Sequence, residues 1–122
     1  MMKQFNLQTG KMGEEIAKEF LEKKGYNIIE QNYKTKYGEI DLVGQLGKEL
    51  VIVEVRTKIG EDFGSPEDSL TKNKLRKIWL NALSYTSKKQ WNGSYRVDAV
   101  CIVLSRAKHN VPERIEHYEN IT

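Results

Sequence analysis

Residues 38–58, GEIDLVGQLGKELVIVEVRTK, decide the fold of this 122-residue chain. They predict two short apolar strands that turn back on each other at Gly47 and form a β-hairpin. Each strand carries an acid between apolar neighbours, Asp41 in the first and Glu54 in the second. A carboxylate is costly to bury unless a positive group pairs with it. These two acids are therefore candidate ligands of a cation.

The rest of the chain predicts helices before and after this hairpin. Apolar residues recur at helical spacing from Lys11 to Lys24, and Gly25 follows where a glycine suits the end of a helix. Ser65 and Pro66 are typical of the start of a second helix, and Thr71 is another candidate for its cap. The expected elements are a helix over 11–24, strands over 26–33, 38–46 and 48–58, a helix after 65, a strand over 95–104 and an edge strand over 114–120.

This order predicts one α/β domain over residues 1–122, in which helices flank a mixed central sheet. Its core is expected over 10–104, and the polar tail over 105–122. The side chains that the second helix is expected to bury are Leu75, Ile78, Trp79, Ala82 and Leu83.

The composition is that of an ordinary soluble globule, 39% apolar and 30% charged. No stretch approaches the ~20 apolar residues of a membrane span, and the N-terminus has no apolar run typical of a secretory signal. The single cysteine, Cys101, lies in an apolar run and can form no intrachain disulfide. We therefore expect a buried thiol and a reducing, cytoplasmic location.

Residues 71–90 carry six lysines and arginines and no acid, within a chain of net charge +3. Such a one-signed stretch is a candidate contact for the phosphate backbone of a nucleic acid, and a merely solvated helix face is the alternative. The basic residues near its start are Lys72, Lys74, Arg76 and Lys77.

Strand alternation places Glu54, Arg56 and Lys58 on one side of the second strand. The simplest hairpin puts Asp41 opposite Val53, and a slip of one residue would put it beside Glu54 instead. Two carboxylates this close favour Mg²⁺ or Mn²⁺, which can polarise a phosphodiester and activate a water. The alternative is a surface ion pair between Glu54 and Arg56, with Asp41 at the start of a turn.

Glu14 favours the cation site over that alternative. On the first helix it shares a face with Ala17 and Leu21, so it is expected to point towards the sheet. It would then be a third inward carboxylate, whereas Glu15, Glu19 and Glu22 are expected to face solvent. For Arg96 and Asp98 we expect a structural ion pair, and the spacing of the two histidines does not favour a zinc site.

A pattern of residues between about positions 10 and 104 matches a known family. It comprises Gly10, Glu14, Ala17, Leu21, Gly25, Tyr26, Asn32, residues 38–43, residues 53–56, Lys58, Gly64, Lys74, Arg96 and Asp98. In this pattern the chain resembles the bacterial YraN family, also called UPF0102. That family is similar to the restriction-endonuclease-like superfamily, which includes the archaeal Holliday junction resolvases.

The resemblance implies a nuclease core in which Asp41 and Glu54 bind the metal, with Glu14 in support. Arg56 takes the place of the superfamily's catalytic lysine, and Lys58 is a hypothetical substitute for it. Lys74 and its basic neighbours would hold the nucleic-acid backbone. Such enzymes often act as two-fold dimers, which makes a homodimer a further expectation.

The sequence therefore predicts a Mg²⁺- or Mn²⁺-dependent endonuclease acting on DNA, with branched or repair intermediates among its candidate substrates. Arginine stays protonated and is a poor proton donor or acceptor, so Arg56 keeps a second interpretation open. In that interpretation the chain is a catalytically weak or inactive nucleic-acid-binding module, or an adaptor, that keeps the nuclease fold.

Overall fold

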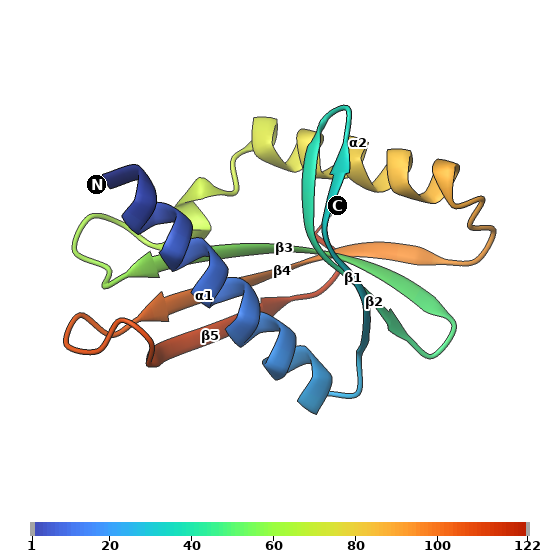
Figure 1. The fold of residues 1–122 in the computed structure, drawn as a ribbon. Helices are drawn as coiled ribbons and strands as arrows, with labels where there is room; N and C mark the ends of the chain where they lie inside the picture. Colours follow the sequence, from blue (N-terminus) through green and yellow to red (C-terminus); the bar gives the residue numbers. More distant parts are fainter. Residues whose placement is uncertain (1, 122) are drawn as a thin grey trace.

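Five strands form one mixed sheet in the order β1-β2-β3-β4-β5, and two helices pack on it (Figure 1). The computed structural model describes residues 2–121. Strands β3 and β4 are parallel, and the other neighbouring pairs are antiparallel. The elements are α1 (Met2–Lys23), β1 (Asn27–Thr35), β2 (Gly38–Leu46), β3 (Glu49–Ile59), the 3₁₀ helix η1 (Pro66–Ser69), α2 (Lys72–Lys88), β4 (Tyr95–Leu104) and β5 (Pro112–Tyr118). The predicted α/β class and mixed sheet are confirmed.

Helix α1 ends where the sequence predicts and begins earlier than predicted. Gly25 has a positive φ of 95°, and the N–H of Tyr26 donates to the Leu21 carbonyl at 3.0 Å. This is the glycine-dependent helix end that position 25 suggested. The start lies at Met2 instead of the expected Lys11.

The β2–β3 hairpin has the predicted turn, but its register is shifted by one residue. Leu42 pairs with Val53, so the expected pairing of Asp41 with Val53 is wrong, and Asp41 lies one step beyond the last pair. From there β2 turns away with β1, while β3 continues beside β4 as far as Ile59 (Figure 1). We call the place where β2 and β3 separate the fork. The part of β3 beyond the fork therefore has a neighbouring strand, β4, on one edge alone.

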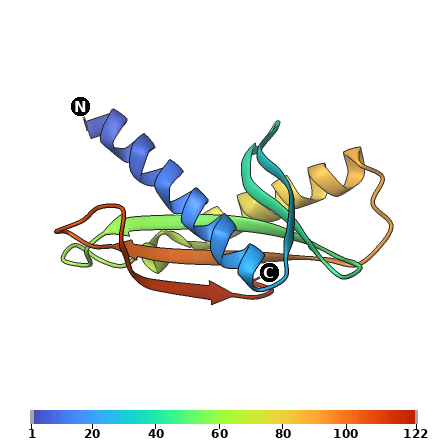
Figure 2. The same cartoon turned by 60° about the horizontal axis from the view of Figure 1, so that its bottom comes forward.

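The two faces of the sheet are covered by different helices, as the view in Figure 2 shows for α1. Ala17 and Leu21 of α1 are fully buried against Val51 and Val53. On the other face, Ile78 and Ala82 of α2 pack with β-strand residues. The strand residues of this second cluster are Ile40, Val43, Leu50, Ile52 and Val97. Because both faces are covered, β4 is buried almost throughout, which its apolar run predicted.

The segment after Ser65 forms two helices, where one continuous helix was the simplest expectation. Asp68 accepts a 2.9 Å hydrogen bond from the N–H of Ser65 and stabilises η1. Thr71 then caps α2 by accepting from the N–H of Lys74 at 3.2 Å. The second candidate cap is thus used as well, and it begins the longer helix.

Two of the five side chains expected in the core under α2 lie at the surface. Trp79 is 36% exposed and stacks on Tyr95, and Leu83 is 39% exposed. The buried face of the helix instead includes Tyr85, which is 3% exposed. The expectation was wrong because Ile78, Ala82 and Tyr85 set the angle at which the helix packs.

Arg96 and Asp98 form the structural ion pair that the sequence predicted, with Nε and Oδ1 3.0 Å apart. Asp98 is fully buried and also lies 2.8 Å from Nε2 of His117 on β5. Cys101 is buried, which raises the pKa of its thiol to about 12. Within residues 2–121, none of the helices is apolar over enough length to cross a bilayer.

Candidate active site

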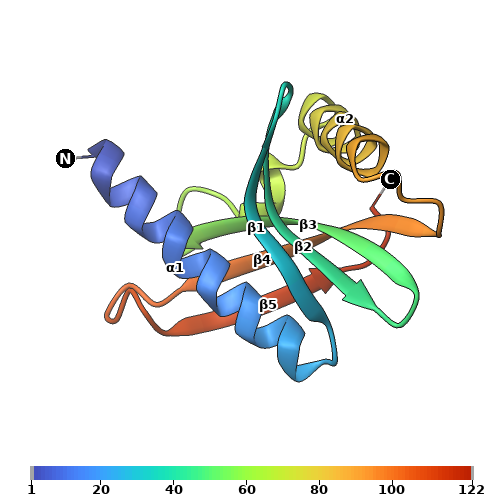
Figure 3. The ribbon, with the colours of Figure 1, turned by 45° about the vertical axis from the view of Figure 1, so that its right-hand side comes forward.

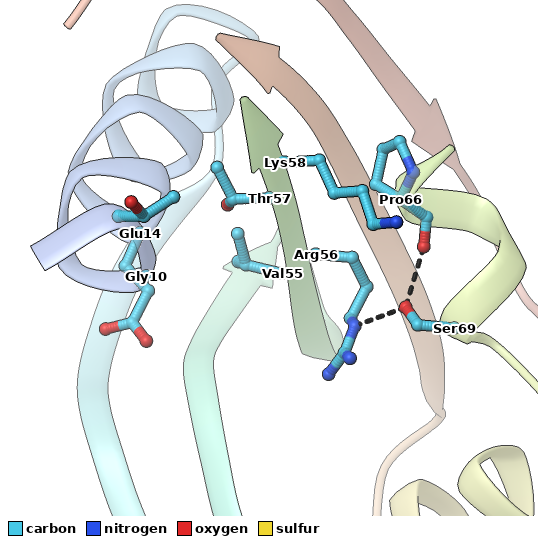
Figure 4. Close-up of a pocket in the computed structure, with 9 residues that line it drawn as sticks. Gly10, Glu14, Val55, Arg56, Thr57, Lys58, Pro66 and Ser69 are labelled. Carbon is cyan, nitrogen blue, oxygen red and sulfur yellow. Dashed lines mark hydrogen bonds between the residues drawn. The ribbon is translucent and has the colours of Figure 1, made fainter. Parts of the chain in front are cut away.

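A cavity of about 300 Å³ opens along the free edge of β3, where β2 has turned away (Figure 4). Its walls come from α1, β3 and η1. The lining residues are Thr9, Gly10, Glu14, Val55, Arg56, Thr57, Lys58, Pro66 and Ser69. Three candidate site residues, Glu14, Arg56 and Lys58, therefore line one cavity, whereas Asp41 and Glu54 are not among its lining residues.

Asp41 lies where β2 and β3 separate. Its Oδ2 accepts a 2.8 Å hydrogen bond from the N–H of Val55, which lies beyond the last pair of the hairpin ladder. Burial, followed by the nearby charge of Glu54, raises the pKa of Asp41 to about 8. Because its ionised form is disfavoured, this carboxyl group is suited to a cationic ligand.

Glu54 is the second acid of the fork and is 6% exposed. Its Oε2 lies 3.2 Å from Nη1 of Arg56 and 3.5 Å from Nζ of Lys74. A buried carboxylate needs such positive partners. The two acids thus differ, because Glu54 forms ion pairs with two cations and Asp41 forms none with the part of the chain that the structure describes.

Arg56 is held between the acid and helix η1. Its Nε donates to Oγ of Ser69 at 2.7 Å, and that hydroxyl donates in turn to the carbonyl of Pro66 at 2.7 Å (Figure 4). Together with the Glu54 contact, these bonds fix the guanidinium at the wall of the cavity. A fixed guanidinium suits the binding of a phosphate oxygen.

Lys58 lies on the same side of β3 as Arg56 and is turned towards the loop before η1 (Figure 4). Its Nζ donates to the carbonyl of Phe63 at 3.3 Å. The Phe63 side chain is 93% exposed. Lys58 therefore lies in the cavity wall, and a ligand would have to compete with this backbone carbonyl for its ammonium group.

Glu14 enters the cavity from α1, as its helical face predicted. Its Oε1 accepts a 2.9 Å hydrogen bond from Nδ2 of Asn32, which also donates to Glu39 at 3.0 Å. Burial raises the pKa of Glu14, and the charges of Glu39 and Glu54 act in the same direction. Glu15, Glu19 and Glu22 are exposed, as expected.

Helix α1 approaches β3 closely beside the cavity. A Cβ atom on Gly13 would lie 1.8 Å from Oγ1 of Thr57, so this contact requires a glycine. Oγ1 of Thr57 is buried and has no hydrogen-bond partner within the described part of the chain. The close contact fixes the distance between Glu14 and the strand that carries Glu54.

The four basic residues predicted to bind nucleic acid do not act as one group. Lys74 is partly buried and turned towards Glu54, whereas Lys72, Arg76 and Lys77 are exposed. Lys74 therefore belongs to the acidic site, and the other three lie on the outer side of α2.

The carboxylates fit a magnesium-type ion better than a metal that needs many protein ligands. Among residues 2–121 no group of three or more His, Cys, Asp or Glu side chains is close enough to hold a metal ion. Mg²⁺ is commonly bound by one or two carboxylates and several waters. Asp41 and Glu54 would supply that number of hard oxygen ligands.

The sequence identified the acids of the site but not all of the residues that hold the site in place. Ser69 was missed, and an isolated serine in a loop carries no signal for its contact with Arg56. Asn32 was part of the family pattern without a role, and its positive φ of 51° marks an unusual position. The ion pair of Lys74 with Glu54 depends on tertiary packing.

Comparisons with known proteins agree with the family pattern. Residues 13–102 match the model of an uncharacterised protein family, UPF0102. A UPF0102 protein of Pelotomaculum thermopropionicum is 40% identical over 112 residues, covering 91% of this chain and 92% of the relative. One from Thermotoga petrophila is 40% identical over 111 residues, covering 91% and 94%, and one from Herpetosiphon aurantiacus is 37% identical over 119 residues, covering 93% and 92%. The chain therefore belongs to the UPF0102 family.

Proposed function

We propose that this protein is a divalent-metal-dependent nuclease with a restriction-endonuclease-like fold. The observation that carries the proposal is the pair of acids at the strand fork. Burial and the charge of Glu54 raise the pKa of Asp41, and Val55, whose N–H binds Asp41, lines the open cavity. An acid held in this way is typical of a functional site more than of a stabilising ion pair.

Each residue of the site would have its own role in the reaction. Asp41 and Glu54 would hold Mg²⁺ or Mn²⁺, which supplies polarisation of the phosphodiester and a water of lowered pKa. Arg56, fixed by Ser69, would bind a nonbridging phosphate oxygen and stabilise the charge that develops there. Lys74 would pair with the Glu54 carboxylate when no metal is bound.

The topology supports the fold assignment, because a mixed sheet is covered by a helix on each face and the acids lie on adjacent central strands. The proposed substrate is DNA, and branched or repair intermediates are candidates within that class. Backbone contacts from basic residues give affinity without sequence preference, which suits recognition of a DNA structure.

One observation favours a second candidate function, a nucleic-acid-binding module without cleavage. Arg56 is already engaged by Glu54 and Ser69, and arginine is a poor proton donor or acceptor. In this case the fork would bind metal and phosphate without turnover.

A cleavage assay separates the two. Labelled four-way, flapped, single-stranded and linear duplex DNA would be incubated with wild type and Glu54→Gln in Mn²⁺, Mg²⁺ or EDTA. Glu15→Gln, on the exposed side of α1, is the matched control. We expect cutting that requires metal, is lost in Glu54→Gln and persists in Glu15→Gln.

Wild type that is folded, binds DNA and cuts none of these substrates in either metal would contradict the nuclease proposal and favour the binding module. Equal cutting by Glu54→Gln would contradict the assigned site.

A further inference from the structure

A second cavity lies between the tip of the β1–β2 hairpin and the C-terminal half of α2, away from the acids. Its volume is about 530 Å³. Figure 3 shows the hairpin rising out of the sheet alongside α2. The lining residues are Tyr33, Lys34, Thr35, Lys36, Tyr37, Leu80, Leu83, Ser84, Ser87 and Lys88, which we call the hairpin groove.

The hairpin groove is basic. Three lysines line it, and its lining contains no carboxylate. Lys34, Lys36 and Lys88 are all exposed, and Nζ of Lys36 lies 5.3 Å from the centre of the Tyr37 ring. The remaining polar members are serine, threonine and tyrosine hydroxyls, and these side chains, with lysine, commonly contact phosphate oxygens.

The groove is fixed by a partly buried contact between its two walls. Thr35 donates a hydrogen bond to Oδ1 of Asn81, whose side chain lies in α2 and is 6% exposed. The N–H of Tyr37 donates to Oγ1 of Thr35 at 3.0 Å. A Cβ atom on Gly38 would lie 3.5 Å from Nδ2 of Asn81, so the turn rests against the helix. The lysines of the tip are therefore presented by an anchored turn.

The groove continues the basic outer side of α2. Arg76, Leu80, Ser84 and Lys88 are spaced four residues apart and lie along one face of the helix. From Lys74, at the acids, to Lys88 the helix rises ~21 Å. That distance corresponds to about six base steps of duplex DNA at ~3.4 Å each.

We propose that the hairpin groove binds the sugar-phosphate backbone of DNA, about six base steps from the phosphate at the acidic site. This inference rests on the proposed function for the position of that phosphate. The groove would give the protein a second, sequence-independent contact and would set the direction of the duplex along α2.

Binding is tested without metal, so that cleavage does not interfere. Wild type, a Lys34→Ala/Lys36→Ala/Lys88→Ala variant and a control variant would bind a labelled 24-base-pair duplex in EDTA. The control, Lys23→Ala/Lys48→Ala/Lys108→Ala, removes the same charge from exposed positions outside the groove. We expect the groove variant to lose affinity about tenfold or more, and the slope of log K against log salt to fall by about 2 to 3.

A single charge reversal keeps the test valid if the triple variant folds poorly. Lys36→Glu and Lys48→Glu each change an exposed lysine in a hairpin turn, and only the first lies at the groove. We expect Lys36→Glu to weaken binding more than Lys48→Glu. Circular dichroism would verify that both are folded.

Several outcomes would overturn the groove. The first is no DNA binding by wild type, and the second is an equal loss of DNA affinity in the groove and control variants. The third is a groove variant that binds DNA normally and loses affinity only for vesicles containing phosphatidylserine. Cleavage by wild type is scored separately. If wild type cuts DNA and the groove variants bind normally, the groove proposal is refuted and the nuclease proposal stands. If the groove variants lose affinity and wild type cuts no DNA, the groove proposal stands and the nuclease proposal is refuted.

Discussion

Replacing Asp41 with asparagine should stabilise the metal-free protein, and the gain should grow with pH. The amide keeps the shape of the side chain and an oxygen that can accept from the N–H of Val55. It removes the negative charge that burial and the nearby Glu54 disfavour. A structural ion pair would behave in the opposite way, so this substitution separates a metal site from an adaptor whose acids only stabilise the fold.

The magnitude follows from the Asp41 pKa, which is raised from 3.8 to about 8 by burial and by Glu54. A shift of that size disfavours the ionised form by about 6 kcal/mol. Since the folded state holds this proton more tightly than the unfolded state, wild-type stability falls as pH rises from about 4 to about 8. Between pH 5 and pH 8.5, the advantage of Asp41→Asn should therefore grow by up to about 4 kcal/mol.

Urea unfolding in EDTA, followed by tryptophan fluorescence at both pH values, measures this difference. The control is Asp62→Asn, because Asp62 is 59% exposed and pairs with Arg106 at the surface. We expect the control to change stability by less than about 0.5 kcal/mol at either pH. Asp41→Asn that lowers stability by more than about 1 kcal/mol at both pH values would refute the reasoning.

Three further predictions concern the supports of the site and the fold. Arg56→Lys should lower metal-dependent cleavage about tenfold or more in single-turnover assays, because lysine lacks the planar group that Ser69 and Glu54 hold in place; an equal or faster variant would contradict this role. Gly13→Ala should lower the free energy of unfolding by about 1 to 3 kcal/mol, since its Cβ would lie 1.8 Å from Oγ1 of Thr57. Adding Thr57→Ala should restore part of that loss, and no recovery in urea unfolding would argue against the clash. Asp98→Asn should cost about 1 to 3 kcal/mol, because a buried amide cannot replace the carboxylate that pairs with Arg96 and His117, and a loss below about 0.5 kcal/mol would show the pair to be dispensable.

Local signals were sufficient for most of the element boundaries. The predicted limits of β2 and β4 match the structure because glycines and polar turns bound apolar runs. The N-terminal half of α1 was missed because Gly10 carries a helix penalty of about 1 kcal/mol. A Cβ atom at Gly10 would meet nothing within 4 Å, so tertiary packing does not explain this glycine.

The contacts between elements could not be predicted from spacing. The hairpin register differs by one residue from the simplest pairing, so Leu42 pairs with Val53 and Asp41 lies beyond the last pair. Trp79 was assigned to the core because helical periodicity fixes the spacing of a stripe but not its centre. Ser69 reaches Arg56 only through the fold of the segment before α2.

The central claim is that Asp41 and Glu54 bind a divalent cation, and the most direct test is Mn²⁺ binding measured by electron paramagnetic resonance. Wild type, Glu54→Gln and the exposed control Glu15→Gln would be titrated without nucleic acid. We predict one Mn²⁺ per chain in wild type and in the control, with affinity reduced at least about tenfold in Glu54→Gln. Equal binding by all three proteins, or no binding by folded wild type, would contradict the account.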